Sequence, residues 1–279
     1  YNMRQGSDTM QDSVIMGSVA EELMDFVSTT PARDSNYTIA CTLLRNYPRL
    51  RDMSLNEIAD LCYVSRPSIS RFCRLFGFKS FKEFSEYLKI DYSISFDYSQ
   101  TLFQSLVQAP QITLEKHTDA IIENLRATVA AENCRDLPQI AMELHRSTHL
   151  AYFSHHFLWD VGRQFQSKMM RMGRYVERYL DYGPQLECAR SLSSDDMAIV
   201  CTIGGSYPTR HANIWQALTA SRCKLLVITQ NHFNPLWNLA QYKLGCGISN
   251  QDDIGKYAAL LAVELLAMTY LRQYGKDFF

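Results

Sequence analysis

The stretch MSLNEIADLCYVSRPSISRFCRLFGFKSFKEF, residues 53–84, decides the fold of the N-terminal third of the chain. Its first signal is a capping box, in which Ser54 is followed three residues later by Glu57. In such a box each side chain satisfies a backbone N–H group at the start of a helix. The stretch therefore predicts a short helix that begins at Ser54 and ends near Tyr63.

A second short helix follows almost at once. Ser65 is a good N-cap, and Pro67 lies in the first turn, where a missing N–H group has no cost. Gly77 stands where a left-handed residue would close this helix. Ser80 and Glu83 then form another capping box. Two short helices joined by a tight turn are typical of a helix-turn-helix.

Two apolar stripes at helical spacing precede this pair, over residues 15–27 and 36–47. Pro48 is expected to end the helix over 36–47. With the helix opened by Ser80, they predict an all-helical bundle over residues 13–90, preceded by a disordered tail over 1–12. The chain has a net charge of −1, but residues 36–90 carry nine basic and five acidic side chains. This local excess fits a DNA-binding surface, and it also fits an ordinary solvated helix.

The helix over 66–76 has two distinct faces. Its inward face takes Ile69, Phe72, Cys73 and Phe76. In a helix-turn-helix the second helix lies in the major groove, where arginine pairs with guanine. The candidate DNA-binding residues are those of the outward face, with two lysines placed for phosphates: Arg66, Ser68, Ser70, Arg71, Arg74, Lys79 and Lys82.

After a predicted linker over 91–112 the pattern changes. Short apolar runs alternate with helical segments, which predicts a doubly wound parallel sheet over residues 113–279. The runs lie at 150–154, 175–179, 197–203, 225–229 and 243–248, and the intervening and final helices at 157–172, 183–192, 209–221, 234–240 and 254–273. The expected fold class is therefore α plus α/β.

The third predicted strand ends in a glycine-rich loop that enters a helix directly. Glycines let the backbone approach an anion, and a helix N-terminus offers free N–H groups. Ligands of such sheets collect beyond the carboxyl ends of the strands. A plain strand-to-helix turn with a hydroxyl cap would look the same. The candidate effector-binding residues come from this loop and from the loop after the first strand: Gly205, Ser206, Tyr207, Thr209, Ser154, His155 and His156.

The segment RFCRLFGFKSF, with the residues before it, closely resembles the DNA-binding module of the RpiR family of bacterial sugar-phosphate-responsive regulators. The second half resembles the sugar-isomerase (SIS) domain of that family at 168–173 and 225–240. The resemblance implies a phosphate loop at 204–209, but Gly204 and Tyr207 replace its first serine and its glycine. The loop at 154–158 lacks the two glycines and the serine of the family.

We therefore expect a regulator of carbohydrate metabolism that binds a double-stranded DNA operator and is gated by a sugar-phosphate-like effector. One alternative is an SIS domain that serves only as a dimerisation scaffold, and a less favoured one is a sugar-phosphate isomerase. We expect no enzyme activity, no cofactor and no metal. The protein is expected to form a homodimer or homotetramer, partly through residues 254–273. Its expected location is the cytoplasm, without a membrane span. The eight scattered cysteines are expected to be reduced core residues.

Overall fold

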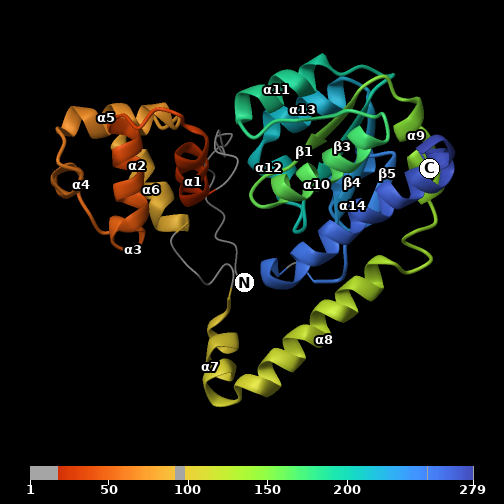
Figure 1. Ribbon diagram of the computed structural model, residues 1–279, viewed down its shortest axis with the longest axis horizontal. Coiled ribbons are helices and arrows are strands. Elements are labelled where there is room, and N and C mark those ends of the chain that lie inside the picture. Colours follow the sequence, from red (N-terminus) through yellow and green to blue (C-terminus); the bar gives the residue numbers. More distant parts are fainter. Residues whose placement is uncertain (1–17, 92–97, 250, 279) are drawn as a thin grey trace. The chain divides into compact units, whose positions relative to one another are not determined.

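A computed structural model of the protein describes residues 18–91, 98–249 and 251–278 (Figure 1). The predicted tail over 1–12 lies outside the described residues. The chain divides into two compact units, and the division falls within helix α8 (Pro110–Thr128), between Ala120 and Ile121. The first part of α8 therefore belongs to the helical unit and its last part, from Ile121, to the other unit.

The first unit is a helical bundle. Its helices are α1 (Val19–Thr29), α2 (Ser35–Arg45), α3 (Tyr47–Leu50), α4 (Leu55–Leu61), α5 (Arg66–Leu75), α6 (Phe81–Asp91) and α7 (Gln100–Gln108). The box of Ser54 and Glu57 caps α4 in both directions, and Ser65 accepts a hydrogen bond from the Ser68 N–H group at the start of α5. Gly77 has a φ of 82°, as the predicted left-handed closure requires.

Apolar side chains at helical spacing hold this bundle together. The inward face of α5 is buried as predicted, because Ile69, Phe72 and Cys73 pack into the core and Phe76 lies edge-on against Phe26. Helices α1, α2, α3, α4 and α6 contribute to the same cluster, through Leu23, Ile39, Leu43, Leu50, Ile58, Phe84 and Leu88 among others.

Two expectations for this half of the chain need correction. Pro48 does not simply end α2, because the chain turns at Asn46 and Pro48 lies in the first turn of the short helix α3. The stretch expected as a linker, 91–112, is helical from Gln100 to Gln108, and α8 already begins at Pro110. The cap that starts α7 is Ser99, whose side chain accepts from the Leu102 N–H group.

The second unit is built on a five-stranded parallel sheet of order β2-β1-β3-β4-β5. The strands are β1 (Leu150–Phe153), β2 (Val176–Arg178), β3 (Met197–Cys201), β4 (Lys224–Thr229) and β5 (Tyr242–Gly245). All residues of β1 and β3 are buried, which explains why these strands read as continuous apolar runs. The chain leaves β1 toward one edge and β3 toward the other, so the predicted doubly wound fold is confirmed.

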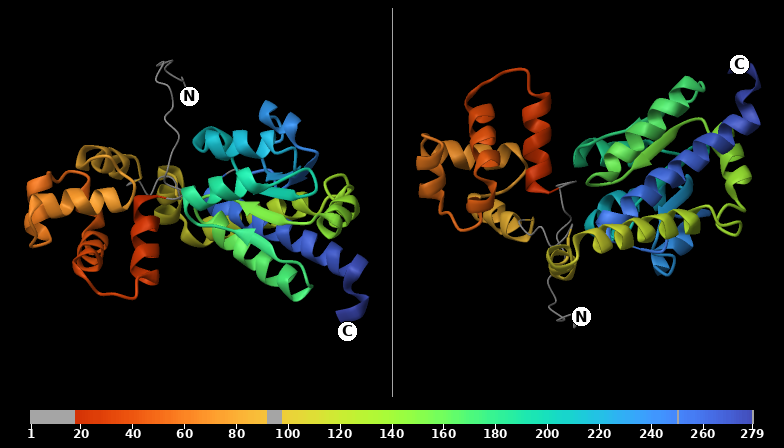
Figure 2. Two further views of the ribbon diagram at one scale, coloured as in Figure 1. Left: turned by 90° about the horizontal axis from the view of Figure 1, so that it is seen from above. Right: turned by 60° about the horizontal axis from the view of Figure 1, so that its bottom comes forward.

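Helices cover both faces of this sheet (Figures 1 and 2). The helices of this unit are the last part of α8, α9 (Leu137–Arg146), α10 (Leu158–Arg171), α11 (Tyr182–Ser191), α12 (Tyr207–Arg210), α13 (Ala212–Ala220) and α14 (Asp252–Tyr274), with 3-10 turns at Pro235–Leu239 and Gly275–Phe278. Alternate strand residues pack with α9, α10 and α14 in one apolar cluster, while α11 and α13 pack together. The helix predicted over 209–221 is broken at His211, whose backbone leaves the helical region.

Helix α14 is long and apolar enough to cross a membrane by length and composition, which we did not expect from the sequence. Half of that apolar window is buried inside the unit. Ala258, Ala262 and Leu266 are fully buried against the sheet cluster, so α14 is a core helix of this unit.

The eight cysteines are all free thiols, as predicted, and most are buried. Burial raises the pKa of Cys73 to about 12 and that of Cys62 to about 11. These thiols therefore stay protonated and pack as small apolar side chains.

The contact of α10 with β1 gives a first prediction. A Cβ atom added at Gly162 would lie 2.2 Å from the ring of Tyr152, which is buried and donates a hydrogen bond to Leu158. Alanine favours a helix over glycine by about 1 kcal/mol, yet we expect Gly162→Ala to destabilise the protein by about 1–3 kcal/mol through overpacking. Chemical denaturation measures this change.

Gly183→Ala is the matched control, because Gly183 lies in α11 with nothing within 4 Å of an added Cβ atom. We expect it to be neutral or stabilising. If Gly162→Ala were as stable as Gly183→Ala, the close packing of α10 on β1 would be contradicted.

Candidate functional site

The outward face of α5 presents cations to solvent. Arg66, Arg71 and Arg74 are exposed, and none of them forms an ion pair with the residues that the structure describes. The Nη2 atom of Arg71 donates to the Ser68 hydroxyl at 3.2 Å, which holds the two side chains together. Ser70 is partly buried on the same helix. The predicted DNA-binding residues of α5 therefore lie on one accessible face.

The two predicted phosphate-binding lysines lie just beyond α5 and are both exposed. The backbone N–H group of Lys79 donates to the Glu83 carboxylate. The side-chain ammonium group of Lys79 takes no part in this hydrogen bond. Lys82 lies 4.0 Å from Glu86, and this exposed pair contributes little. The capping box at Ser80 is only half formed, since the Glu83 carboxylate takes the N–H group of Lys79 in place of that of Ser80.

Tyr63, in the turn between α4 and α5, is a residue that the sequence reasoning did not select. Its φ is 54°, a left-handed conformation that costs a non-glycine residue about 1–2 kcal/mol. Its side chain is 96% exposed, so no packing in the described unit compensates for this cost. Such strain collects at functional sites. The sequence offered one sign of this strain, because a bulky tyrosine stands in a tight turn where glycine is expected.

Replacing Tyr63 tests this strain. We expect Tyr63→Gly to stabilise the protein by about 0.5–1 kcal/mol, because glycine adopts the left-handed region freely but loses more chain entropy on folding. Tyr63→Ala keeps the strained φ and removes the same ring, so it should bring no gain. Thermal unfolding compares the two variants, and equal stabilities would show that the turn is unstrained.

The second candidate site lies at the carboxyl edge of the sheet, where β1 and β3 are neighbours with oppositely directed connections. Such a switch point forms the crevice of doubly wound folds. The loop after β1 brings His155 next to the loop after β3, with its Nε2 atom 3.4 Å from the Ser206 hydroxyl. The structure thus brings together predicted residues that are 51 positions apart in the sequence.

Histidine side chains fill much of this crevice. His155 is buried, and its Nδ1 atom lies 3.3 Å from Nε2 of His211, a fully buried residue that the sequence reasoning left out of the site. His156 adopts a left-handed φ of 51° and contacts Arg210 through its Nε2 atom at 2.8 Å. The three histidines approach one another, but the described residues include no group of three side chains arranged to hold a metal ion.

Two further predicted residues lie deep in the unit. Tyr207 is fully buried and donates to the side-chain oxygen of Gln185 at 2.7 Å, while the Gln185 amide donates to the backbone oxygen of Ser154. The Ser154 hydroxyl is buried, with no hydrogen-bond partner among the described residues. Tyr207 is therefore a structural support of the crevice, and Ser154 joins the same network through its backbone oxygen.

The glycine-rich loop differs from the predicted phosphate cradle. The helix that it enters is the four-residue α12, and the Tyr207 N–H group donates to Thr202 while that of Thr209 bonds to the Ser206 backbone oxygen. The Thr209 hydroxyl donates to the same oxygen at 2.9 Å. The expected row of free helix N–H groups over 209–221 is thus absent from this described loop. Gly205, with a φ of 80°, lies against Asn231.

The environment of His155 determines its charge. Burial, followed by electrostatic interactions with His156, His211 and Arg210, holds the pKa of His155 well below its usual value. His155 is therefore neutral near pH 7 and acts as a hydrogen-bonding group, so a cationic role for His155 in anion binding is not supported.

This shift has a consequence for stability. The unfolded chain takes up a proton at His155 near pH 6.5 while the folded chain does not, so stability is full above that pH and falls as the pH decreases. We expect a loss of about 1 kcal/mol between pH 6.5 and 5.5, and a smaller loss in His155→Gln, as measured by denaturation at each pH. The same loss in both proteins would mean that His155 is charged in the folded state.

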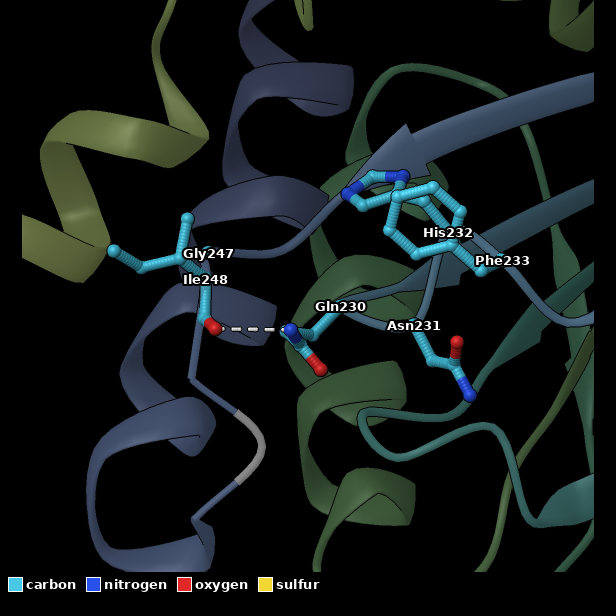
Figure 3. A pocket seen from close by; sticks show the side chains of 6 residues that line it. All are labelled: Gln230, Asn231, His232, Phe233, Gly247 and Ile248. Carbon is cyan, nitrogen blue, oxygen red and sulfur yellow. Dashed lines mark hydrogen bonds between the residues drawn. The ribbon is translucent and has the colours of Figure 1, made fainter.

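An open pocket lies farther along the same edge of the sheet, beyond the ends of β4 and β5 (Figure 3). It has a volume of about 480 Å³, within the range of small-molecule sites. Its lining residues are Gln230, Asn231, His232, Phe233, Gly247 and Ile248. The sequence reasoning named none of them, because their side chains carry no motif.

Comparisons with known proteins agree with this architecture. Residues 28–95 match the model of the helix-turn-helix domain of the rpiR family. An HTH-type transcriptional regulator of Haemophilus influenzae is 24% identical over 240 residues, which are 83% of each chain. Another, of Caldanaerobacter subterraneus, is 27% identical over 180 residues, 62% of this chain and 61% of that one.

Among solved structures, the Vibrio vulnificus NanR protein complexed with ManNAc-6P is similar in fold. Its TM-score is 0.53 at 18% identity, and the match covers 91% of this chain and 93% of that one. A helix-turn-helix unit followed by a doubly wound α/β unit, as found here, defines a transcriptional regulator of the helix-turn-helix class. The helix-turn-helix unit of this chain is similar to that of the rpiR family of such regulators.

Proposed function

We propose that the protein binds a double-stranded DNA operator through α5 and that a sugar-phosphate-like effector in its SIS-type unit controls this binding. The observation that carries the proposal is the outward face of α5, where Arg66, Arg71 and Arg74 are exposed and without ion-pair partners in the described part of the chain. Cations held on one face of a recognition helix suit the guanine edges and phosphates of a major groove.

The residues of this surface take different roles. Arg71 and Arg74 read base edges, while Arg66, Ser68 and Ser70 bond to bases or phosphates near the start of α5. Lys79 and Lys82 contact phosphates. Tyr63 adds a contact to the DNA backbone from the turn before α5, which accounts for an exposed aromatic residue in a strained conformation.

Gel shifts test the DNA-reading role, with a duplex that the protein selects from a random library. We expect Arg71→Ala and Arg74→Ala each to weaken binding to this duplex by about 1–3 kcal/mol and to bind a scrambled duplex with little change. Lys79→Ala should weaken binding to both duplexes and reduce the salt dependence, because it removes a phosphate contact.

Lys243→Ala serves as a control, since this exposed lysine lies on β5 in the other unit. It should bind as the wild type does. If both arginine variants kept full affinity for the selected duplex, α5 would not be the DNA-reading element.

For the effector, we propose the crevice between β1 and β3 as the site. The groups that an anion would meet there are the Ser206 hydroxyl, the buried Ser154 hydroxyl and the imidazoles of His155 and His156. Gly205 and Tyr207 shape the loop, and Thr209 contributes less than the sequence suggests because its hydroxyl is used locally. The ManNAc-6P complex of the Vibrio protein, which has a similar fold, supports a phosphosugar as the class of effector.

The remaining assignments follow from the same proposal. We assign no enzyme activity, since the relatives are named as regulators and His155 is held in a packed cluster. The protein acts in the cytoplasm, where its operator lies, as a homodimer or homotetramer. The exposed apolar side chains Tyr257, Leu260 and Met268 of α14 fit an assembly surface. A scaffold without an effector is the second candidate, favoured by the filled crevice.

A further inference from the structure

The pocket beyond β4 and β5 combines fixed walls with an uncovered apolar rim. Phe233 is 94% exposed and Ile248 59% exposed, and both line the pocket. Figure 3 shows their side chains with the amides of Gln230 and Asn231, which come from the same edge of the sheet. A few side-chain amides beside exposed apolar side chains are typical of a small-molecule site, whose ligand covers the apolar rim on binding.

Side-chain hydrogen bonds hold both walls in place. The Gln230 amide donates to the Ile248 backbone oxygen at 2.9 Å and so joins the loop after β4 to the loop after β5. The Trp237 indole donates to the Asn231 backbone oxygen at 2.7 Å. Asn231 in turn lies against Gly205, at the end of β3. The pocket is therefore organised before a ligand enters, which reduces the entropy cost of binding.

The lining chemistry indicates the class of ligand. The lining residues that the structure describes include no lysine or arginine, so these residues offer a phosphate no fixed positive charge. The two amides offer both donors and acceptors, which match hydroxyl groups. Phe233 offers an exposed ring for the apolar face of a sugar.

One wall of the pocket is bonded to α8. The side-chain oxygen of Asn124 accepts from the N–H groups of Ile248, at 2.6 Å, and of Ser249, at 2.9 Å. Asn124 is 1% exposed, and an added Cβ atom at Gly247 would lie 2.2 Å from it, so the fit is tight. Because α8 contains the division between the two units, a shift of the 247–249 wall acts directly on the helix that leads to the DNA-binding unit.

We propose that this pocket binds a neutral carbohydrate ring and that Asn124 transmits its occupancy to α8. The site is separate from the crevice proposed for the anionic effector. Its effect on DNA depends on the proposed regulatory function, whereas the binding of the ring does not.

Titration calorimetry on the full chain tests the site, with glucose, N-acetylglucosamine, their 6-phosphates and adenosine as probes. We expect at least one neutral sugar to bind and Phe233→Ala to weaken it tenfold or more. Tyr175→Ala is the matched control, since this exposed aromatic residue lies outside the pocket, and it should change nothing. No binding of either neutral sugar, tighter binding of adenosine, or equal affinity in Phe233→Ala would overturn the site.

Gel shifts with the selected duplex test the transmission. The sugar that binds should change the DNA affinity of the wild type at least threefold. Asn124→Asp keeps the accepting oxygen, and two backbone N–H donors stabilise the carboxylate that it introduces, so it should retain this response. The amide N–H groups that it loses have no partner among the described residues. Asn124→Leu removes the acceptor and should lose the response while calorimetry still detects the sugar.

The two failures are distinguishable. The transmission would be refuted if the bound sugar did not change the DNA affinity of the wild type, or if it changed the DNA affinity of Asn124→Leu equally. Either result would leave the sugar site standing. Loss of sequence-selective DNA binding in the absence of any sugar would instead refute the proposed function. Thermal unfolding of both Asn124 variants establishes that they are folded.

Discussion

The carboxyl edge of the parallel sheet imposes the constraint on which the second unit depends. Backbone N–H and C=O groups that leave the ladder there need partners, since an unpaired buried group costs about as much as a lost hydrogen bond. Side-chain amides supply them. The Asn133 side chain accepts from the N–H group of Gly245 and donates to its backbone oxygen. The Asn124 side chain accepts from the N–H groups of Ile248 and Ser249. Gln185 and Thr202 act similarly at the ends of β1 and β3.

These bonds also decide which parts of the edge can accept a ligand. Between β1 and β3 the amide and hydroxyl groups are largely engaged, and His155, Tyr207 and His211 occupy the space. Beyond β4 and β5 the same kind of bonding fixes the loops but leaves the space above them open. Asn124 links this open part to α8, so one set of backbone-satisfying contacts both shapes the pocket and connects it to the rest of the chain.

The sequence predicted the elements well because capping boxes and apolar periodicity are local signals. The helix pair around Ser65 and the strand at Met197–Cys201 illustrate this. The site was harder to predict. His211 and Gln185 reach the crevice only through tertiary packing, and the pocket at Phe233 depends on two loops brought together by the sheet. The break at His211 was also missed, since no glycine or interior proline marks it.

In our proposal, the DNA-reading helix and the open edge of the sheet are coupled through α8. Coupling of this kind is reciprocal, so DNA must affect the pocket wall as the ligand affects DNA binding. Hydrogen–deuterium exchange of the full chain, with and without the selected duplex, measures this directly. We expect slower exchange in peptides that cover α5 together with altered exchange at the N–H groups of Ile248 and Ser249. Protection of α5 with unchanged exchange at these two groups would contradict it.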